Sequence, residues 1–292
     1  ENNMKNLLSS SYPEGFDRNH DEGGNQIMAT AYLARWSGPV TESDDPFNVY
    51  SNVSPLDLSV KKHAQQVIFV PDRANATDNN NIKTALMEHG ALATTIYYAD
   101  TYYKAANFSY YYNGIFSSNH AVGIVGWDDT YSRYNFSSTP SVDGAFIVKN
   151  SWGTTWGDGG YFYVSYYDTR IGKNNALFTA ESTKNYDRIY QYDPLGWVNN
   201  IGYPSSTQPT TGWFANIFQS SNPESVRAVS FYVPRVNTSY ALYIYKDPDS
   251  GPINSSGPSV TQTGVIGAPG YYTVPLNQNV PLNSDEKFSV VM

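Results

Sequence analysis

Apolar residues in the first 180 positions of the chain follow two different spacings. In Asn80–His89 they recur three or four positions apart and Gly90 follows, which predicts a helix that stops at this glycine. Gln26–Trp36 shows a similar spacing and predicts a second short helix. Short apolar runs predict buried strands at 67–70, 91–98, 120–127, 145–149 and 161–166. This mixture of helices and strands is typical of an α+β fold.

The pattern changes after the polar run Glu181–Lys184, which we take as a domain boundary. Beyond it, short alternating or apolar runs are separated by clusters of Pro, Gly, Asn and Ser, as in an antiparallel β-sandwich. The predicted strands of this part cover residues 188–192, 213–219, 226–233, 240–245, 270–274 and 287–291. We therefore expect two domains, one of residues 1–184 and an all-β sandwich domain of residues 185–292.

Composition limits the classes of partner. A hydrophobic content of 40% is enough for packed cores, and only 15% of the 292 residues are charged. The net charge of -8, from 18 basic and 26 acidic residues, argues against a nucleic-acid partner, because such a partner requires a basic surface. No apolar run approaches the roughly 18 residues of a membrane-spanning helix, so we expect this segment not to be transmembrane.

Six Asn-x-Ser/Thr sequons are weak indicators of the cellular compartment. They begin at Asn52, Asn75, Asn107, Asn135, Asn237 and Asn254. Such sequons are acceptors for N-glycosylation in secreted proteins. A chain rich in Asn, Ser and Thr also produces them by chance, so both readings, a secreted glycoprotein and a coincidence, stay open.

The candidate chemistry lies on two of the predicted strands. His120 begins the apolar run of residues 120–127, and Asn150 ends the run of residues 145–149. Two strands of an antiparallel sheet can bring these side chains next to each other. An imidazole held by an amide is the base and the orienting group of a nucleophile–base–orienter triad.

The residues around this pair resemble the His and Asn segments of the papain-like (C1) cysteine peptidases. The two matching stretches are Asn119–Gly123 and Lys149–Gly157. The resemblance implies a papain-like fold and a hydrolase that cleaves peptide or protein substrates without a cofactor or a metal. His120 would be the general base and Asn150 would orient it. Trp152 would shield their contact from water, and Trp156 would line the leaving-group side of the cleft.

Two further segments were considered as binding sites. Gly23-Gly24 matches the glycine pair that precedes a helix in this family and binds the substrate backbone as an added strand. The same pair also serves as a helix lead-in without any ligand, and this alternative stays open. Asp128 and Asp129 lack the spaced ligands of a calcium loop, so no metal site is expected there. Asp158 is interpreted as a turn residue.

The chain contains no cysteine, so the nucleophile of such an enzyme is missing from these residues. In papain-like enzymes the cysteine lies roughly 130–150 residues before the histidine, which here falls upstream of Glu1. Glu1–Leu8 resembles the segment that follows the nucleophile in the family. We therefore expect an N-terminal segment, either intact or cleaved into a separate fragment, that carries the cysteine and an oxyanion-hole glutamine. The alternative is a catalytically inactive peptidase-like protein that acts as a surface or carbohydrate-binding module.

The second domain resembles the lectin-like β domain that follows papain-like domains in some archaeal and bacterial surface proteins. The resemblance depends on residues 190–197 and 228–232. Trp197, Trp213 and Tyr271 are compatible with a carbohydrate platform, and large aromatic residues of this kind are also typical of a core. Together with the low charge, the resemblance implies an extracellular or cell-surface protein.

Overall fold

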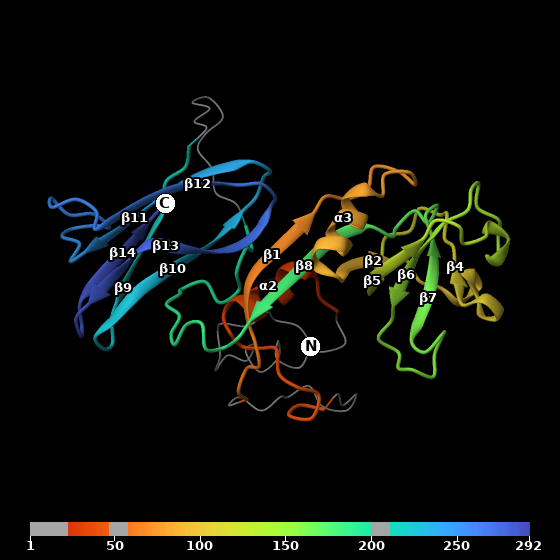
Figure 1. The fold of residues 1–292 in the computed structure, drawn as a ribbon, viewed down its shortest axis with the longest axis horizontal. Helices are drawn as coiled ribbons and strands as arrows, with labels where there is room; N and C mark the ends of the chain where they lie inside the picture. The colour runs from red at the N-terminus through yellow and green to blue at the C-terminus, as the bar shows by residue number, and fades with distance from the viewer. Residues whose placement is uncertain (1–22, 47–57, 200–210) are drawn as a thin grey trace. The chain divides into compact units, whose positions relative to one another are not determined.

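A computed structural model of the chain describes residues 23–46, 58–199 and 211–292. The chain divides into two compact units, one of residues 67–179 and one that combines residues 1–66 with 180–292. Strands β1 (His63–Val70) and β8 (Lys173–Glu181) cross the boundaries between these units (Figure 1). The segment Glu1–Leu8 and the sequon at Asn52 lie outside the described residues. The division predicted at residue 184 stays a prediction.

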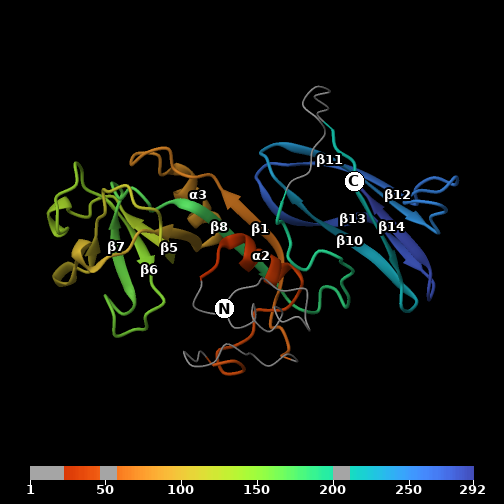
Figure 2. The same cartoon turned by 180° about the vertical axis from the view of Figure 1, so that it is seen from behind.

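The unit that contains the C-terminal half consists mainly of antiparallel sheet. Its elements are α2 (Gln26–Ala34), β9 (Ala215–Gln219), β10 (Glu224–Val233), β11 (Thr238–Lys246), β12 (Val260–Ile266), β13 (Gly270–Leu282) and β14 (Lys287–Val291). One sheet has the strand order β12-β11-β14-β9, and β10 pairs with β13 in the other (Figure 2). This arrangement confirms a separate domain of sheet in the C-terminal part of the chain.

The strand predictions for this part were incomplete. Residues 188–192 form no strand, whereas β12 was not predicted at all. The strand predicted at 270–274 continues to Leu282 as β13, through two prolines, Pro275 and Pro281. A proline lacks the N–H that donates within a sheet ladder. Because of these two prolines, the sequence pattern did not indicate a strand in the second half of β13.

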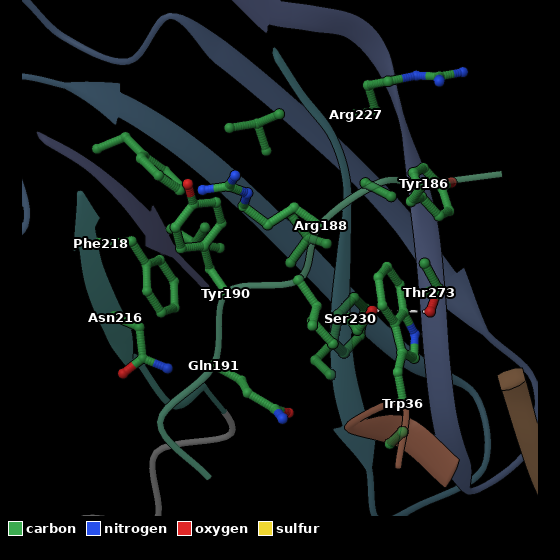
Figure 3. Close-up of a pocket in the computed structure, with 18 of the residues that line it drawn as sticks. Trp36, Tyr186, Arg188, Tyr190, Gln191, Asn216, Phe218, Arg227, Ser230 and Thr273 are labelled. Atoms are coloured by element: carbon green, nitrogen blue, oxygen red, sulfur yellow. Dashed lines mark hydrogen bonds between the residues drawn. The ribbon is translucent and has the colours of Figure 1, made fainter. Parts of the chain in front are cut away.

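A cavity of about 760 Å³ lies in this same unit. Its walls come from the end of α2, from residues 186–193 and from β10 and β13. Figure 3 shows aromatic side chains around it, among them Trp36, Tyr186 and Tyr190, with Arg188 between the two tyrosines. The indole of Trp36 is stacked on the buried imidazole of His63, with ring centroids 3.7 Å apart.

The unit of residues 67–179 contains one helix and a mostly antiparallel sheet. Its elements are α3 (Asn80–His89), β2 (Leu92–Ile96), β3 (Tyr103–Lys104), β4 (Ser109–Tyr110), β5 (His120–Asp128), β6 (Ala145–Lys149), β7 (Tyr161–Ser165) and three short 3₁₀ helices (Asp100–Tyr102, Ala105–Asn107, Arg133–Asn135). The strands follow the order β8-β2-β5-β6-β7-β4-β3, and β4 pairs with β7 in parallel. Helix α3 has the predicted bounds, and Gly90 caps it with a φ of 94°.

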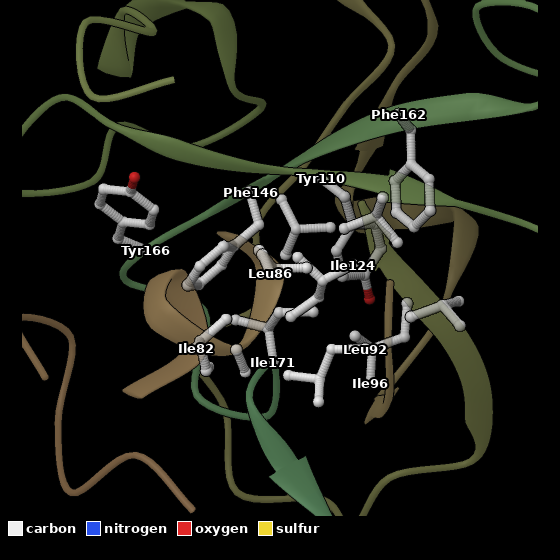
Figure 4. Packing of buried hydrophobic residues seen from close by; sticks show 14 of the residues in the cluster. Ile82, Leu86, Leu92, Ile96, Tyr110, Ile124, Phe146, Phe162, Tyr166 and Ile171 are labelled. Carbon is white, nitrogen blue, oxygen red and sulfur yellow. The ribbon is translucent and has the colours of Figure 1, made fainter. Parts of the chain in front are cut away.

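The core of this unit lies between α3 and the sheet. Ile82 and Leu86 come from the helix, and Leu92, Ile124 and Phe146 come from three neighbouring strands (Figure 4). Burial of a side chain of this size contributes about 1.5–3 kcal/mol relative to its exposure. The core therefore fixes the sheet whose strand ends carry the candidate catalytic residues.

The described residues contain neither a membrane-spanning helix nor a cluster of metal-binding side chains. None of the helices in those ranges is both long enough and apolar enough to cross a bilayer. The same residues contain no group of three or more metal-binding side chains. Asp128 accepts hydrogen bonds from Thr130, and Asp129 binds Lys83 and the hydroxyl of Tyr166, so the two carboxylates have different partners.

Candidate active site

His120 occupies the first position of β5. Its strand pairs with β2 so that His120 lies opposite Ile96, and the preceding residue, Asn119, donates its backbone N–H to the Ile96 carbonyl at 3.0 Å. The strand start is therefore held by the sheet ladder. The imidazole is half-buried, so one part of the ring remains accessible.

Asn150 follows the last residue of β6, the neighbour of β5 in the sheet. Its backbone N–H donates to the Gly160 carbonyl at 2.9 Å, which ties it across the hairpin of β6 and β7. The residue is buried, with 7% of its surface exposed. Because β5 and β6 are antiparallel, the start of one strand and the end of the other lie at the same sheet edge. The structure therefore brings His120 and Asn150 together, with Nε2 and Oδ1 2.8 Å apart.

The hydrogen bonds of this pair determine which ring nitrogen of His120 carries the hydrogen that faces Asn150. Asn150 Oδ1 also accepts the backbone N–H of Ser151 at 2.8 Å, so the atom that faces His120 is an acceptor. His120 Nε2 must then donate its hydrogen to that oxygen. A neutral imidazole with its hydrogen on Nε2 carries a lone pair on Nδ1. The ring is therefore oriented to take a proton at Nδ1.

Trp152 covers the imidazole. Its indole stacks on His120 with centroids 4.8 Å apart and an interplanar angle of 25°, while 41% of the residue stays exposed. Trp156 meets Trp152 edge-on at 5.0 Å and packs against Tyr103 and Phe162. Trp156 thus connects the indole over the site to the core of the unit.

The turn that carries both tryptophans depends on glycine. Gly157 has a φ of +60°, and a Cβ at this position would lie 2.4 Å from the carbonyl oxygen of Tyr161. Only glycine fits such a position without a backbone shift. Asp158 belongs to the same turn, since its backbone N–H donates to the Tyr161 carbonyl at 2.8 Å, in agreement with its interpretation as a turn residue.

Gly23 and Gly24 lie at the start of α2, directly before its N-cap Asn25. Both glycines are exposed, and Gly23 has a φ of +71°. Asn25 Oδ1 accepts the backbone N–H of Met28, which explains why the helix begins here. The two glycines belong to the other compact unit, and their role in substrate binding stays a prediction.

The aromatic residues considered as a carbohydrate platform have different surroundings. Tyr271 is buried, and both it and Trp197 contact the ring of Tyr232. Trp213 is 61% exposed and stacks on Tyr243. Only Tyr271 among the three lines the cavity of this unit.

Two residues near His120 were not identified from the sequence as part of the site. Tyr98, which follows β2, lies edge-on to the Trp152 indole at 4.7 Å and 6.1 Å from the imidazole. Asn119 holds the backbone of Tyr98 through both of its side-chain atoms. The sequence shows only a tyrosine-rich stretch here, and the signal that would have singled out Tyr98 is the β2–β5 register.

Comparison with known proteins identifies both parts of the chain. The sequence model of the papain family of cysteine proteases matches residues 7–180, and the sequence model of the lectin-like domain matches residues 189–292. A cysteine protease of Blomia tropicalis is 24% identical over 177 residues, which are 58% of this chain and 48% of that protein. A viral cathepsin of Adoxophyes honmai nucleopolyhedrovirus is 30% identical over 162 residues, 53% of this chain and 42% of that protein. The chain thus spans about half the length, or less, of these curated relatives.

Solved structures resemble the chain over its whole length. The clostridial cysteine protease Cwp84 after propeptide cleavage is 25% identical, with a TM-score of 0.78 over 100% of this chain and 71% of that chain. The protease and lectin-like domains of Cwp84, a surface layer associated protein of Clostridium difficile, give 24% identity and a TM-score of 0.79 over 99% and 64% of the two chains. With its papain-like fold and a lectin-like domain after it, the chain belongs to the papain family of cysteine proteases.

Proposed function

We propose that the chain provides the histidine and asparagine of a cysteine endopeptidase site that cleaves peptide bonds. The hydrogen bond from His120 Nε2 to Asn150 Oδ1 carries this proposal, because it leaves Nδ1 as the basic nitrogen. The nucleophilic cysteine is not among the 292 residues, so it must be supplied by protein outside them. An N-terminal segment of the same gene product, intact or cleaved, is the proposed source.

The reaction follows from these positions. His120 Nδ1 takes the proton of the cysteine thiol, and the thiolate attacks the carbonyl carbon of the scissile bond. The resulting imidazolium gives its proton to the leaving amine, which produces an acyl-enzyme. Water, deprotonated by the same nitrogen, then releases the acid product and restores the thiol. Throughout the cycle Asn150 keeps the Nε2 hydrogen bond and so holds the ring in one orientation.

Trp152 contributes by excluding water. Its ring lies over the imidazole, beside the hydrogen bond to Asn150. A hydrogen bond is electrostatically stronger where water is excluded. Trp156 supports this indole and, by the resemblance, faces the leaving-group side of the cleft. By the same resemblance, Gly23-Gly24 would bind the substrate backbone as an added strand.

The test uses the complete protein, including the part that precedes residue 1. We expect a thiol-directed epoxide to label a cysteine outside residues 1–292, as read from intact mass, and a peptide substrate to be hydrolysed. His120→Ala should lower kcat/KM by about 10²–10⁴-fold, the usual contribution of a general base. His89→Ala is the matched control, because this histidine lies at the end of α3 and pairs with its neighbour Glu88.

Two outcomes would contradict the proposal. One is hydrolysis by the His120→Ala variant at the rate of the wild-type protein. The other is a complete protein with no cysteine at the nucleophile position and no labelling. The second outcome would favour the alternative, an inactive peptidase-like protein that acts as a binding module.

A second candidate function is carbohydrate binding in the cavity of Figure 3, which is lined by residues of the lectin-like region and by residues that precede it in the sequence. Trp36, Tyr186 and Tyr190 offer ring faces, and Gln65 also lines the cavity. Gln65 is 7% exposed, and its Nε2 has no hydrogen-bond partner among the described residues. A glycan array with the complete protein tests this function, and loss of any signal in Gln65→Leu together with Tyr186→Ala would locate it. An array without signal would contradict it.

We also propose a cell-surface location. Cwp84, which resembles this chain over its whole length, is a surface layer associated protein. The sequons at Asn75, Asn107, Asn135, Asn237 and Asn254 are compatible with a secreted glycoprotein. Fractionation of the native source, followed by mass analysis of the surface fraction before and after glycosidase treatment, distinguishes the location from the modification.

A further inference from the structure

Tyr98 is fixed in place from three sides. The side chain of Asn119 brackets its backbone: Asn119 Oδ1 accepts the Tyr98 N–H at 2.6 Å, and Asn119 Nδ2 donates to the Tyr98 carbonyl at 3.0 Å. The phenol ring stacks on Tyr110 with centroids 5.2 Å apart. Burial, with a smaller contribution from the Asp100 carboxylate, raises the pKa of the Tyr98 hydroxyl. The ring therefore has little freedom to rotate.

The ring of Tyr98 contacts Trp152, the indole that covers the His120 imidazole. Tyr98 meets Trp152 edge-on, with centroids 4.7 Å apart and an interplanar angle of 84°. Trp152 in turn stacks on His120 at 4.8 Å. Asn119 is the residue directly before His120, so these four residues form a closed ring of contacts from His120 through Trp152, Tyr98 and Asn119 back to His120.

Trp152 needs support from neighbouring side chains to stay over the imidazole. The indole is 41% exposed, and it lies on a turn rather than on a strand. An exposed indole on a turn can rotate away from the ring it covers. Trp156 restrains one edge of Trp152 from within the same turn, and Tyr98 restrains it from the segment that follows β2.

We propose that Tyr98 is a positioning residue that holds Trp152 over the His120–Asn150 hydrogen bond, and that Asn119 fixes Tyr98 for this role. The proposal rests on the proposed peptidase function for its effect on turnover. Its effect on the imidazole does not depend on turnover. Tyr98 acts through Trp152 and takes no part in proton transfer.

The first readout is the Nε2–H proton of His120, measured by ¹H–¹⁵N NMR in the complete protein with labelled histidine and assigned with His120→Ala. In the wild-type protein and in Tyr98→Phe, which keeps the ring, we expect a signal that exchanges slowly with water. In Tyr98→Ala the exchange should accelerate by about tenfold or more, because Trp152 no longer stays over the bond. Tyr134→Ala removes an exposed tyrosine (67% exposed) from the same unit and serves as the control.

The second readout is turnover of a peptide substrate. Tyr98→Ala should lower kcat by about 10–100-fold with little change in KM, since the orientation of the base is disturbed and the substrate contacts are kept. Tyr98→Phe should restore most of the loss. If Tyr98→Ala fails to fold, Asn119→Ala, which removes both bracketing hydrogen bonds, should show the same changes to a smaller degree.

The outcomes separate the two proposals. A slowly exchanging Nε2–H in both Tyr98→Ala and Asn119→Ala would overturn the role of Tyr98, whether or not the protein cleaves peptides. Absence of hydrolysis by the wild-type protein, with the exchange rates as expected, would overturn the peptidase function and leave the positioning role standing.

Discussion

Arg73 is the buried cation of the unit that contains His120, and replacing it tests how this unit is held together. Its side chain is 4% exposed and donates four hydrogen bonds. Nε donates to the Ile171 carbonyl at 3.0 Å, Nη1 to Asn79 Oδ1 at 2.8 Å and to the Tyr166 carbonyl at 2.9 Å, and Nη2 to the Asp168 carbonyl at 2.9 Å. These bonds connect the end of β7 and the residues after it to the segment before α3.

Arg73→Met keeps an unbranched side chain and removes all the donors. A buried acceptor left without a partner costs about 1–3 kcal/mol, so four acceptors cost about 8 kcal/mol. Burial works in the opposite direction, because it lowers the pKa of Arg73 from 12.5 to about 10. That depression corresponds to about 3 kcal/mol of charge desolvation that methionine avoids. The expected net loss of stability is about 3–5 kcal/mol, in the range for removing one partner of a buried ionic network.

Native-state hydrogen exchange is the suitable assay, because the chain has two compact units and a single denaturation midpoint does not isolate one of them. The backbone amide of Val148, a fully buried residue of β6, should report the opening of the whole unit. At about 1.4 kcal/mol for each factor of ten, we expect its protection to fall by about 10²–10⁴-fold.

The control is Arg133→Met, which removes a surface guanidinium that donates to the Ser141 carbonyl and should leave the protection of Val148 unchanged. A loss of less than tenfold in Arg73→Met would refute the reasoning. It would mean that water or a local shift satisfies the released carbonyl groups, and that the buried hydrogen bonds of Arg73 contribute no net stability.

Three further substitutions test other parts of the same unit. Gly157→Ala should destabilise it by about 1–3 kcal/mol, since the added Cβ meets the Tyr161 carbonyl oxygen at 2.4 Å; unchanged amide protection would contradict this. Phe146→Ala should cost about 3–5 kcal/mol, because the ring is fully buried; a loss below about 1 kcal/mol, measured by native-state hydrogen exchange, would be inconsistent with the packing. Burial raises the pKa of Asp168 from 3.8 to about 6. Between these pH values the folded protein binds more protons than the unfolded protein. The contribution of Asp168 to stability is therefore complete below pH 3.8 and is lost as the pH rises through 6. Asp168→Asn should flatten the profile of stability against pH in that window, and an unaltered profile would show that another group causes it.

The candidate site was predictable because its two main residues lie on neighbouring strands with clear patterns. His120 and Asn150 stand at the ends of apolar runs, and one hairpin connection brings them together. Tyr98 was not predictable in the same way. Its place beside Trp152 depends on the register of β2 against β5, in which Ile96 faces His120, and the sequence of either strand alone does not specify that register.

The errors in the C-terminal strands also have physical causes. In β12 the inward position 262 is a glutamine, whose Nε2 donates to the Pro275 carbonyl and whose Oε1 accepts the Asn277 N–H. A polar residue that satisfies the backbone inside the sheet breaks the apolar alternation on which the prediction depended. In the segment 188–192, Tyr190 and Tyr192 alternate as in a strand, but they pack their rings on Phe218 while the backbone joins no sheet.

The long connection between β5 and β6, residues 129–144, joins the strands at the ends opposite to His120 and Asn150. At roughly 3.3 Å per residue, the nine residues of β5 place this connection about 25 Å from the imidazole. Its buried anchor is Phe136, which packs on Tyr111 and Tyr131. Inserted peptides, affinity tags or attached reporter groups should therefore be tolerated on the exposed stretch 137–139 without disturbing the base, provided that Phe136 is retained.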